Sequence, residues 1–275
     1  MDIYEIVTEF YQSVKTEKRV IGQTLLGRNI YAVKVGDGSP VGLAQYAMHG
    51  REFITAKLAL HHFRYGLRVG SFWLVPLVNP DGALLSQTGI RSVRDLSVRE
   101  KLLAWNKGDT DFSLWKANAA GVDLNVNFPA FWGKGMKNVR TRGGENCIGD
   151  TPFSEKETFA LKNFTREIHP DYTVSYHTKG EEIYWYFYQS MRTCPLHKRL
   201  ALALSASTGY PLAYAKGSAG GYKDWCIKSL KIPAFTIEAG ADTLTHPIGD
   251  NGLDDIIKKN ERALNDLTKE YLQGR

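Results

Sequence analysis

The chain has 275 residues, which is enough for one large domain or two small ones. Hydrophobic residues make up 43% of the chain and charged residues 23%, so it can form a core and is not a disordered protein. The net charge of +6 fits an anionic partner, but no run of Lys and Arg exceeds two residues, so we expect a solvated basic surface and no nucleic-acid partner.

Signals for membrane insertion and for secretion are both weak in the sequence. The longest apolar run, residues 72–78, is too short to span a bilayer. The first residues carry Asp2 and Glu5 where a secretory signal would have an apolar core. The three cysteines have no paired spacing, which fits a reducing compartment. We therefore expect a cytoplasmic protein with no membrane partner.

The first third of the chain shows short elements separated by turn signals. Apolar spacing predicts a helix over residues 2–16. Strands are predicted at residues 20–26, 30–35, 41–48 and 71–78, with a helix at residues 54–65 between the last two. The run Asn79-Pro80-Asp81-Gly82, which follows, is interpreted as a turn.

The rest of the chain begins with a long segment, residues 83–152, that has little regular pattern and is expected to be functional or locally structured. Ser154 and Glu157 have the spacing of a capping box and predict the start of a helix. Later elements are predicted as a strand at 172–176, a helix at 195–207, a strand at 234–237 and a closing helix at 253–272. Because strands alternate with helices, we expect one α/β domain over residues 1–275, an α/β/α sandwich with a mixed, mostly parallel sheet.

Four polar residues stand just after predicted strands: His49, Asn79, His177 and Glu238. In α/β sheets, ligands bind at this edge. His49 and Glu52 lie three positions apart, and zinc takes nitrogen and carboxylate ligands, although such a pair is also common in polar loops.

His177 is a second candidate ligand or a boundary residue of its strand. Glu238 is costly to bury without a task, so it suits either a general base or a salt-bridged structural acid. His246 is a weaker candidate for the site. The histidines interpreted as structural or surface residues are His61, His62, His169 and His197.

Five motifs occur in a fixed order along the chain. They are His49-Gly50-Arg51-Glu52, Asn79-Pro80-Asp81-Gly82, Asp123-Leu124-Asn125-Val126-Asn127-Phe128, the strand-final His177 and Phe235-Thr236-Ile237-Glu238. Together they resemble the zinc carboxypeptidase family typified by carboxypeptidase A. The resemblance implies a carboxypeptidase A-like fold and a zinc metallopeptidase.

Two further runs are similar to a bacterial branch of that family. They are His177-Thr178-Lys179-Gly180-Glu181-Glu182-Ile183-Tyr184-Trp185 and Gly220-Gly221-Tyr222-Lys223-Asp224-Trp225. The branch holds the γ-D-glutamyl-L-diamino acid endopeptidases, which cut peptidoglycan stem peptides. The resemblance therefore implies a murein stem peptide as the substrate, cut between γ-D-glutamate and diaminopimelate or another L-diamino acid.

The resemblance also implies roles for individual residues. His49, Glu52 and His177 would hold one Zn²⁺, with water in the fourth place. Glu238 would take a proton from that water and pass it to the leaving amine. Lys116 falls where the family carries an arginine that stabilises the oxyanion, so it is expected to supply that charge.

Substrate binding is expected at Arg51, beside the first ligand, and at Asn125, which matches the asparagine that holds a terminal carboxylate. The next residue, Val126, departs from the family's arginine, and a valine cannot clamp a carboxylate. This departure favours a substrate that continues past the cut or is held differently. The candidates to replace the missing charge are Lys179, Arg140 and Arg142.

The family's mobile tyrosine is placed at Tyr222, after the Gly-rich residues 217–221, with Tyr214 as the alternative. The other interpretation of Tyr222 is packing beside Trp225.

Two other functions are weighed against the peptidase. One is a zinc-dependent deacylase or amidase of a small N-acyl amino acid, which would not be expected to carry the two further runs. The other is a stem-peptide binding module without turnover. The intact His49, Glu52, His177 and Glu238 argue against it, whereas Val126 leaves it open. No oligomeric state is inferred.

Overall fold

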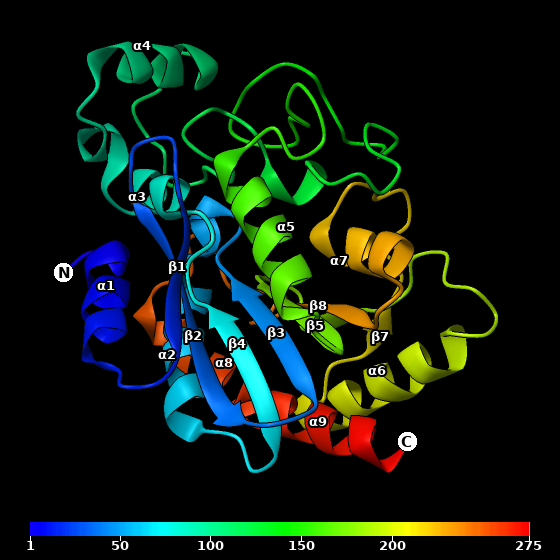
Figure 1. The fold of residues 1–275 in the computed structure, drawn as a ribbon. Coiled ribbons are helices and arrows are strands. Elements are labelled where there is room, and N and C mark those ends of the chain that lie inside the picture. Colours follow the sequence, from blue (N-terminus) through cyan, green and yellow to red (C-terminus); the bar gives the residue numbers. More distant parts are fainter. Residues whose placement is uncertain (275) are drawn as a thin grey trace.

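The computed structural model describes residues 1–274. The strands in that range are β1 (Lys18–Gln23), β2 (Asn29–Asp37), β3 (Val41–Tyr46), β4 (Gly70–Val75), β5 (Tyr172–His177), β6 (Glu182–Tyr184), β7 (Leu212–Ala213) and β8 (Ala234–Glu238). They form one eight-stranded sheet in the order β1-β2-β4-β3-β5-β8-β6-β7 (Figure 1). The four central strands β4, β3, β5 and β8 are parallel, whereas β1, β2 and β6 join by antiparallel pairing.

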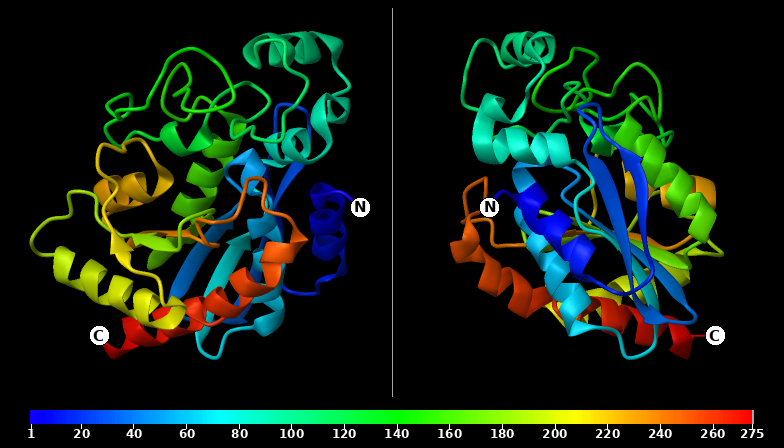
Figure 2. Two further views of the ribbon diagram at one scale, coloured as in Figure 1. Left: turned by 180° about the vertical axis from the view of Figure 1, so that it is seen from behind. Right: turned by 60° about the vertical axis from the view of Figure 1, so that its left-hand side comes forward.

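Helices cover both faces of this sheet. One face packs against α1 (Ile3–Ser13), α2 (Ile54–Tyr65), α6 (Cys194–Thr208), α8 (Leu253–Asn260) and α9 (Ala263–Gln273). The other face packs against α5 (Lys156–Ile168) and α7 (Tyr222–Trp225) (Figures 1 and 2). The predicted α/β/α sandwich with a mixed, mostly parallel sheet is confirmed.

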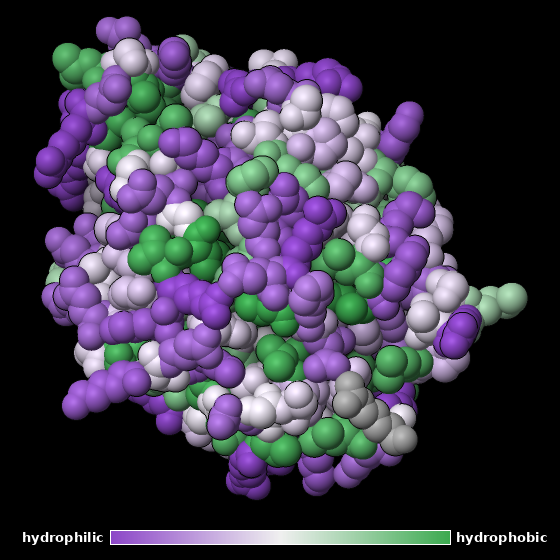
Figure 3. All heavy atoms as spheres, in the orientation of Figure 1, coloured by the Kyte–Doolittle hydropathy of each residue, from purple (hydrophilic) through white to green (hydrophobic). Residues whose placement is uncertain are grey.

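The strands in the middle of the sheet are buried on both faces because helices cover both. β4 and β5 are buried along their whole length, as is typical of parallel strands between two helical layers. On the outer face shown in Figure 3, apolar side chains lie in small groups separated by hydrophilic ones. None of the helices within residues 1–274 combines the length and apolar character that crossing a bilayer requires.

Two helices that the sequence did not predict lie at the carboxyl end of β3 and β4. They are α3 (Pro80–Thr88) and α4 (Leu96–Trp105), and both pack on a small apolar cluster that includes Leu85 and Leu102. The interpretation of residues 79–82 as a turn was wrong. The Asn79 side chain accepts a hydrogen bond from the Gly82 amide at 2.9 Å, and Pro80 takes the first helical position, so this run begins a helix.

Two helix boundaries also differ from the prediction. α5 begins at Lys156 without a capping box, because the Ser154 hydroxyl donates to Glu155 and accepts from Asn127. The predicted closing helix is two helices, and the first ends at Asn260. The buried Asn260 amide donates to the Ile256 carbonyl and to the Tyr210 hydroxyl, which competes with the regular hydrogen bonds of a continuing helix.

Candidate functional site

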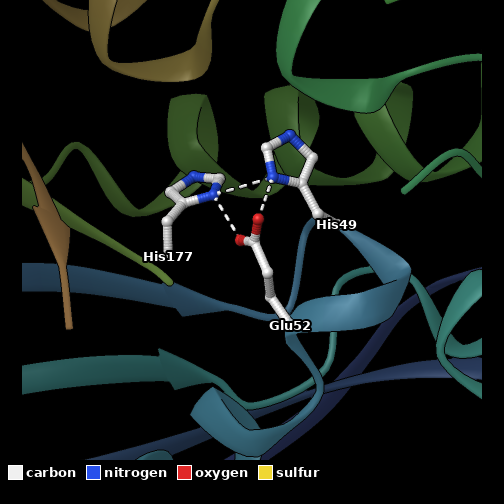
Figure 4. Close-up of side chains that lie close together, drawn as sticks. All are labelled: His49, Glu52 and His177. Atoms are coloured by element: carbon white, nitrogen blue, oxygen red, sulfur yellow. Dashed lines mark hydrogen bonds and ion pairs between the residues drawn. The ribbon is translucent and has the colours of Figure 1, made fainter. Parts of the chain in front are cut away.

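Three polar side chains from neighbouring strands meet at the carboxyl edge of the sheet. His49 follows β3, Glu52 ends the short 3-10 turn Gly50–Glu52, and His177 is the last residue of β5. Because β3 and β5 are parallel neighbours, both histidines leave the sheet at the same edge, and all three side chains point toward one another (Figure 4). All three are buried.

The inward-facing atoms of these side chains form a tight group. His177 Nδ1 lies 2.9 Å from Glu52 Oε2 and 3.1 Å from His49 Nδ1. His49 Nδ1 lies 2.8 Å from Glu52 Oε1. In the part of the chain that the structure describes, no other three His, Cys, Asp or Glu side chains bring ligand atoms within 4.8 Å of one another. Two imidazole nitrogens and a carboxylate are a donor set that catalytic zinc sites use, so these residues fit the metal.

Asp123 lies behind the first histidine, and the sequence did not predict a role for it. Its Oδ1 atom is 3.2 Å from His49 Nε2, and a carboxylate on the outer nitrogen of a ligating histidine fixes the ring orientation. Burial raises the pKa of Asp123, but Lys116 and His49 outweigh burial and hold that pKa well below its usual range. The sequence feature that could have indicated this role is the position of Asp123 at the start of the motif Asp123–Phe128.

Glycine lets a second loop approach these ligands. The Gly50 amide donates to the Lys116 carbonyl at 2.9 Å, and the Arg51 amide donates to the Trp115 carbonyl at 2.9 Å. A Cβ at Gly50 would come within 2.4 Å of the Gly82 carbonyl oxygen, so no larger residue fits without movement. The His-Gly-Arg-Glu run therefore positions Lys116 as well as the ligands.

Lys116 is mostly buried and close to acids. Its Nζ atom lies 3.6 Å from Asp123 Oδ2. Burial lowers the pKa of Lys116, but Asp123 and Glu52 outweigh burial and raise it. Lys116 thus keeps its positive charge at neutral pH.

Glu238 ends β8 and stands beside His177 in the parallel register of β5 and β8. Burial raises the pKa of Glu238 to about 7, with a further contribution from Glu52, while His177 and Lys116 oppose the rise. A carboxyl group with a pKa near neutrality can both accept and donate a proton under physiological conditions.

Four of these side chains, His49, Lys116, Asp123 and Glu238, line a cavity of about 530 Å³. They contribute to its wall together with the predicted substrate-binding Asn125 and with Val126, where the family's arginine is missing. Further lining residues are Met136, Tyr184, Tyr214, Lys216, Lys223, Asp224 and Thr236. Sequence reasoning missed Lys223 and Asp224, although they stand inside a run that it had singled out.

The prediction that Tyr222 binds substrate is wrong. Its side chain is fully buried in the core and packs against Phe128 and Trp225, and its hydroxyl lies 2.9 Å from the Thr165 hydroxyl. Packing beside Trp225 was the other interpretation of this residue. Tyr214, the alternative for a mobile tyrosine, is 65% exposed and lines the cavity.

Two other predicted substrate-binding residues do not line the cavity. Arg51 directs a guanidinium nitrogen to the Leu114 carbonyl at 3.4 Å. Lys179 forms an ion pair with the exposed Asp242 at 2.9 Å. Arg140 and Arg142 are also engaged elsewhere, with Trp132 and Asp150 respectively. The structure therefore corrects the expectation that Lys179, Arg140 or Arg142 replaces the missing arginine.

The loop that carries Lys116 rests on buried acids. The Asn118 side chain donates to Glu155 at 2.8 Å and to Glu157 at 3.2 Å, and its Oδ1 atom accepts from the Val122 amide at 3.0 Å. Burial raises the pKa of Glu157 to about 8, and Asp81 adds to this rise. Glu157 is therefore neutral in the folded protein at pH 7.

Replacing this acid makes a testable change in stability. The pKa of Glu157 is about 8 in the folded protein and 4.5 in its ordinary state. The stability of the wild type therefore falls as the pH rises from about 4.5 to about 8. Glu157→Gln removes the ionisation, so its unfolding free energy relative to wild type should increase by a few kcal/mol between about pH 5 and about pH 9. Urea unfolding at both pH values measures this difference, and a difference that does not grow with pH would contradict it.

Comparison with known proteins gives a consistent result. The model of the family described as zinc carboxypeptidase matches residues 6–261. Gamma-D-glutamyl-L-diamino acid endopeptidase 1 of Lysinibacillus sphaericus is 32% identical over 249 residues, covering 84% of this chain and 62% of that protein. The chain thus spans less than two thirds of the length of this relative.

Two other proteins extend the comparison. Murein peptide amidase A of Escherichia coli K12 is 30% identical over 209 residues, covering 72% of this chain and 70% of that protein. Bovine thrombin-activatable fibrinolysis inhibitor, in its complex with tick carboxypeptidase inhibitor, superposes with a TM-score of 0.75 over 100% of this chain and 98% of that chain. Its identity of 19% makes this a likeness of fold.

Proposed function

Because the chain belongs to the zinc carboxypeptidase family, we propose that it hydrolyses the bond between γ-D-glutamate and a diamino acid in peptidoglycan stem peptides. One observation carries the peptidase activity: the His49, Glu52 and His177 group opens through His49 onto the same cavity that Glu238 lines, and Glu238 stands beside His177 in the sheet. The names of two relatives, an endopeptidase for γ-D-glutamyl-L-diamino acids and a murein peptide amidase, support the substrate class. Residues 1–275 would act as a single catalytic domain, and a cytoplasmic location stays a prediction.

One Zn²⁺ would be held by His49 Nδ1, His177 Nδ1 and the Glu52 carboxylate. When bound, zinc supplies a Lewis acid that polarises the scissile carbonyl and makes water more acidic. Asp123 keeps the His49 ring oriented through its 3.2 Å contact with Nε2. The protein thus holds the donor set in place before substrate arrives.

Glu238 moves the protons of the reaction. As a carboxylate it accepts a proton from the attacking water, and as a carboxylic acid it donates that proton to the amine of the leaving diamino acid. Its raised pKa suits both roles, because a group with a pKa of about 7 changes state readily at neutral pH.

Lys116 provides positive charge where the carbonyl oxygen becomes negative. Lys116→Met should lower kcat by about 10²- to 10³-fold with little change in KM, because the charge matters most in the transition state. Lys116→Arg, which keeps the charge, should retain more activity than Lys116→Met. Steady-state kinetics with zinc content measured in parallel test this, and a normal kcat for Lys116→Met would contradict the role.

The substrate proposal is tested by product analysis. Zinc-loaded protein is incubated with L-Ala-γ-D-Glu-meso-diaminopimelate, with and without a chelator, and the products are identified by mass spectrometry. Release of L-Ala-D-Glu and free diaminopimelate, abolished by the chelator, is the expected result. No cleavage of this peptide or of the stem tetrapeptide by a zinc-loaded sample would overturn the proposal.

The apolar Val126 in the cavity wall bears on the mode of cleavage. A valine provides no clamp for a terminal carboxylate. We therefore expect the tetrapeptide, which continues past the cut, to be cleaved as well as the tripeptide.

A further inference from the structure

A buried ion pair lies in the wall of the active-site cavity, and the mechanism above does not use it. Lys223 and Asp224 lie within α7, are 6% and 4% exposed, and both line the cavity. Lys223 Nζ lies 2.5 Å from Asp224 Oδ1. Burying two charges is costly unless they have good partners, so a pair kept in a cavity wall calls for an explanation.

The pair stands at the inner end of the cavity. The lining residues at the rim, such as Met136 and Tyr214, are 83% and 65% exposed, whereas Lys223 and Asp224 are almost inaccessible. α7 packs on β8, where the lining residue Thr236 lies two positions before Glu238. Two positions along a strand are about 7 Å, so the cavity extends about that far inward from the general base.

The polar atoms of the pair are incompletely used by the protein. Lys223 donates to Asp224 and to the Tyr186 carbonyl at 3.3 Å, which accounts for two of its three N–H groups within the described chain, and its ammonium lies 5.3 Å from the centre of the Phe187 ring. Asp224 Oδ2 accepts only the Gly221 amide, at 3.3 Å, among the described residues. The ammonium and the carboxylate therefore each keep hydrogen-bonding capacity for a ligand, and both residues line the cavity.

We propose that Lys223 and Asp224 bind the distal amino-acid group of the diamino acid on the leaving side of the cut bond. Lys223 would contact its distal carboxylate and Asp224 its distal ammonium. The inference rests on the proposed function and makes the substrate's diamino acid diaminopimelate in preference to lysine. The four carbon–carbon bonds from the α-carbon of diaminopimelate to its distal carbon span about 5 Å, which suits the depth of the cavity.

The charges of Lys223 and Asp224 explain why diaminopimelate would be preferred to lysine. The distal group of diaminopimelate is a zwitterion, so it meets a neutral ion pair with opposite charges aligned. The lone ammonium of lysine would approach Lys223 without a carboxylate to offset the repulsion. A distal carboxamide would likewise leave the Lys223 charge without an anionic partner.

Three peptides test this inference: L-Ala-γ-D-Glu followed by meso-diaminopimelate, by its distal carboxamide, or by L-lysine. We expect wild-type kcat/KM to be about 10- to 100-fold higher for the first peptide than for the other two. In Lys223→Met, the kcat/KM values for the diaminopimelate peptide and its carboxamide should become equal. The kcat/KM for the lysine peptide should rise relative to both, because Asp224 then lacks its cation. Lys216→Met, which removes an equal charge from the exposed rim of the same cavity, is the matched control and should keep the wild-type ratios.

Wild-type ratios in a folded Lys223→Met variant would overturn the inference while leaving the proposed function intact. If Lys223→Met does not fold, Lys223→Gln, which retains donors for Asp224, is measured with the same expectation. If the zinc-loaded wild type cleaves none of the peptides, the proposed function fails separately, and calorimetric titration of the peptides decides the inference. Equal Kd values for the first two peptides in wild type would then overturn it, and a preference that Lys223→Met abolishes would support it.

Discussion

Glu238→Gln should lower kcat on the stem tripeptide by about 10²- to 10⁴-fold while the zinc content stays at the wild-type value. The amide has almost the shape of the carboxyl group, but it cannot accept the proton of water. Glu238 is not one of the three clustered metal-binding candidates, so the metal site stays intact. Single-turnover kinetics and elemental analysis of the same sample measure both quantities.

The matched control is Glu182→Gln. Glu182 stands opposite Glu238 in the antiparallel register of β6 and β8 but does not line the cavity. Its substitution should leave kcat within a few-fold of wild type. Normal turnover by Glu238→Gln would show that another group is the base.

The pH dependence has a defined sign. The base acts as a carboxylate, so activity should be full above the pKa of Glu238 and should fall as pH decreases through it. Burial raises this pKa, and a bound cation acts in the opposite direction. In a plot of kcat/KM against pH, the wild type should show a fall in activity toward acid pH. The residual activity of Glu238→Gln should show no such fall.

His177→Ala should reduce bound zinc from about one ion per chain toward zero after dialysis, and peptidase activity should fall in parallel. His177 Nδ1 is the atom that faces both Glu52 and His49, so its loss leaves two ligands where a catalytic site uses three. Elemental analysis gives the metal content, and thermal unfolding shows whether the variant still folds.

A surface histidine provides the control for this variant. His61 lies on α2, and its ring faces Glu261 at 3.3 Å. His61→Ala should therefore keep both zinc and activity. Unchanged zinc in a folded His177→Ala variant would remove His177 from the proposed ligand set.

Much of the site could be predicted because each key residue follows a strand with a clear apolar pattern. His177 and Glu238 end β5 and β8, His49 closely follows β3, and the carboxyl ends of parallel strands meet at one edge of a sheet. The spacing of His49 and Glu52 within one turn then brings the carboxylate to the same point. Local pattern and sheet topology made these residues candidates, and the resemblance to zinc carboxypeptidases implied their roles.

The substrate-binding predictions were weaker because they fell in irregular segments. In a loop or a short helix, the direction of a side chain depends on what packs around it, and the sequence does not contain that information. Tyr222 and Lys223 are adjacent, yet the first enters the core beside Phe128 and the second faces the cavity. Lys179 follows the ligand strand closely but turns to Asp242.

The sequence by itself thus determined the α/β/α fold class, the resemblance to zinc carboxypeptidases and the residues of the metal cluster, because periodic burial and ordered motifs are local properties of the chain. Only the tertiary structure decided which charges face the cavity. Lys223 and Asp224 are far from His49 in the sequence, and packing of α7 against β8 brings them to the wall of the same cavity. Such a contact depends on the whole fold, since a buried charge is placed by all the elements that enclose it.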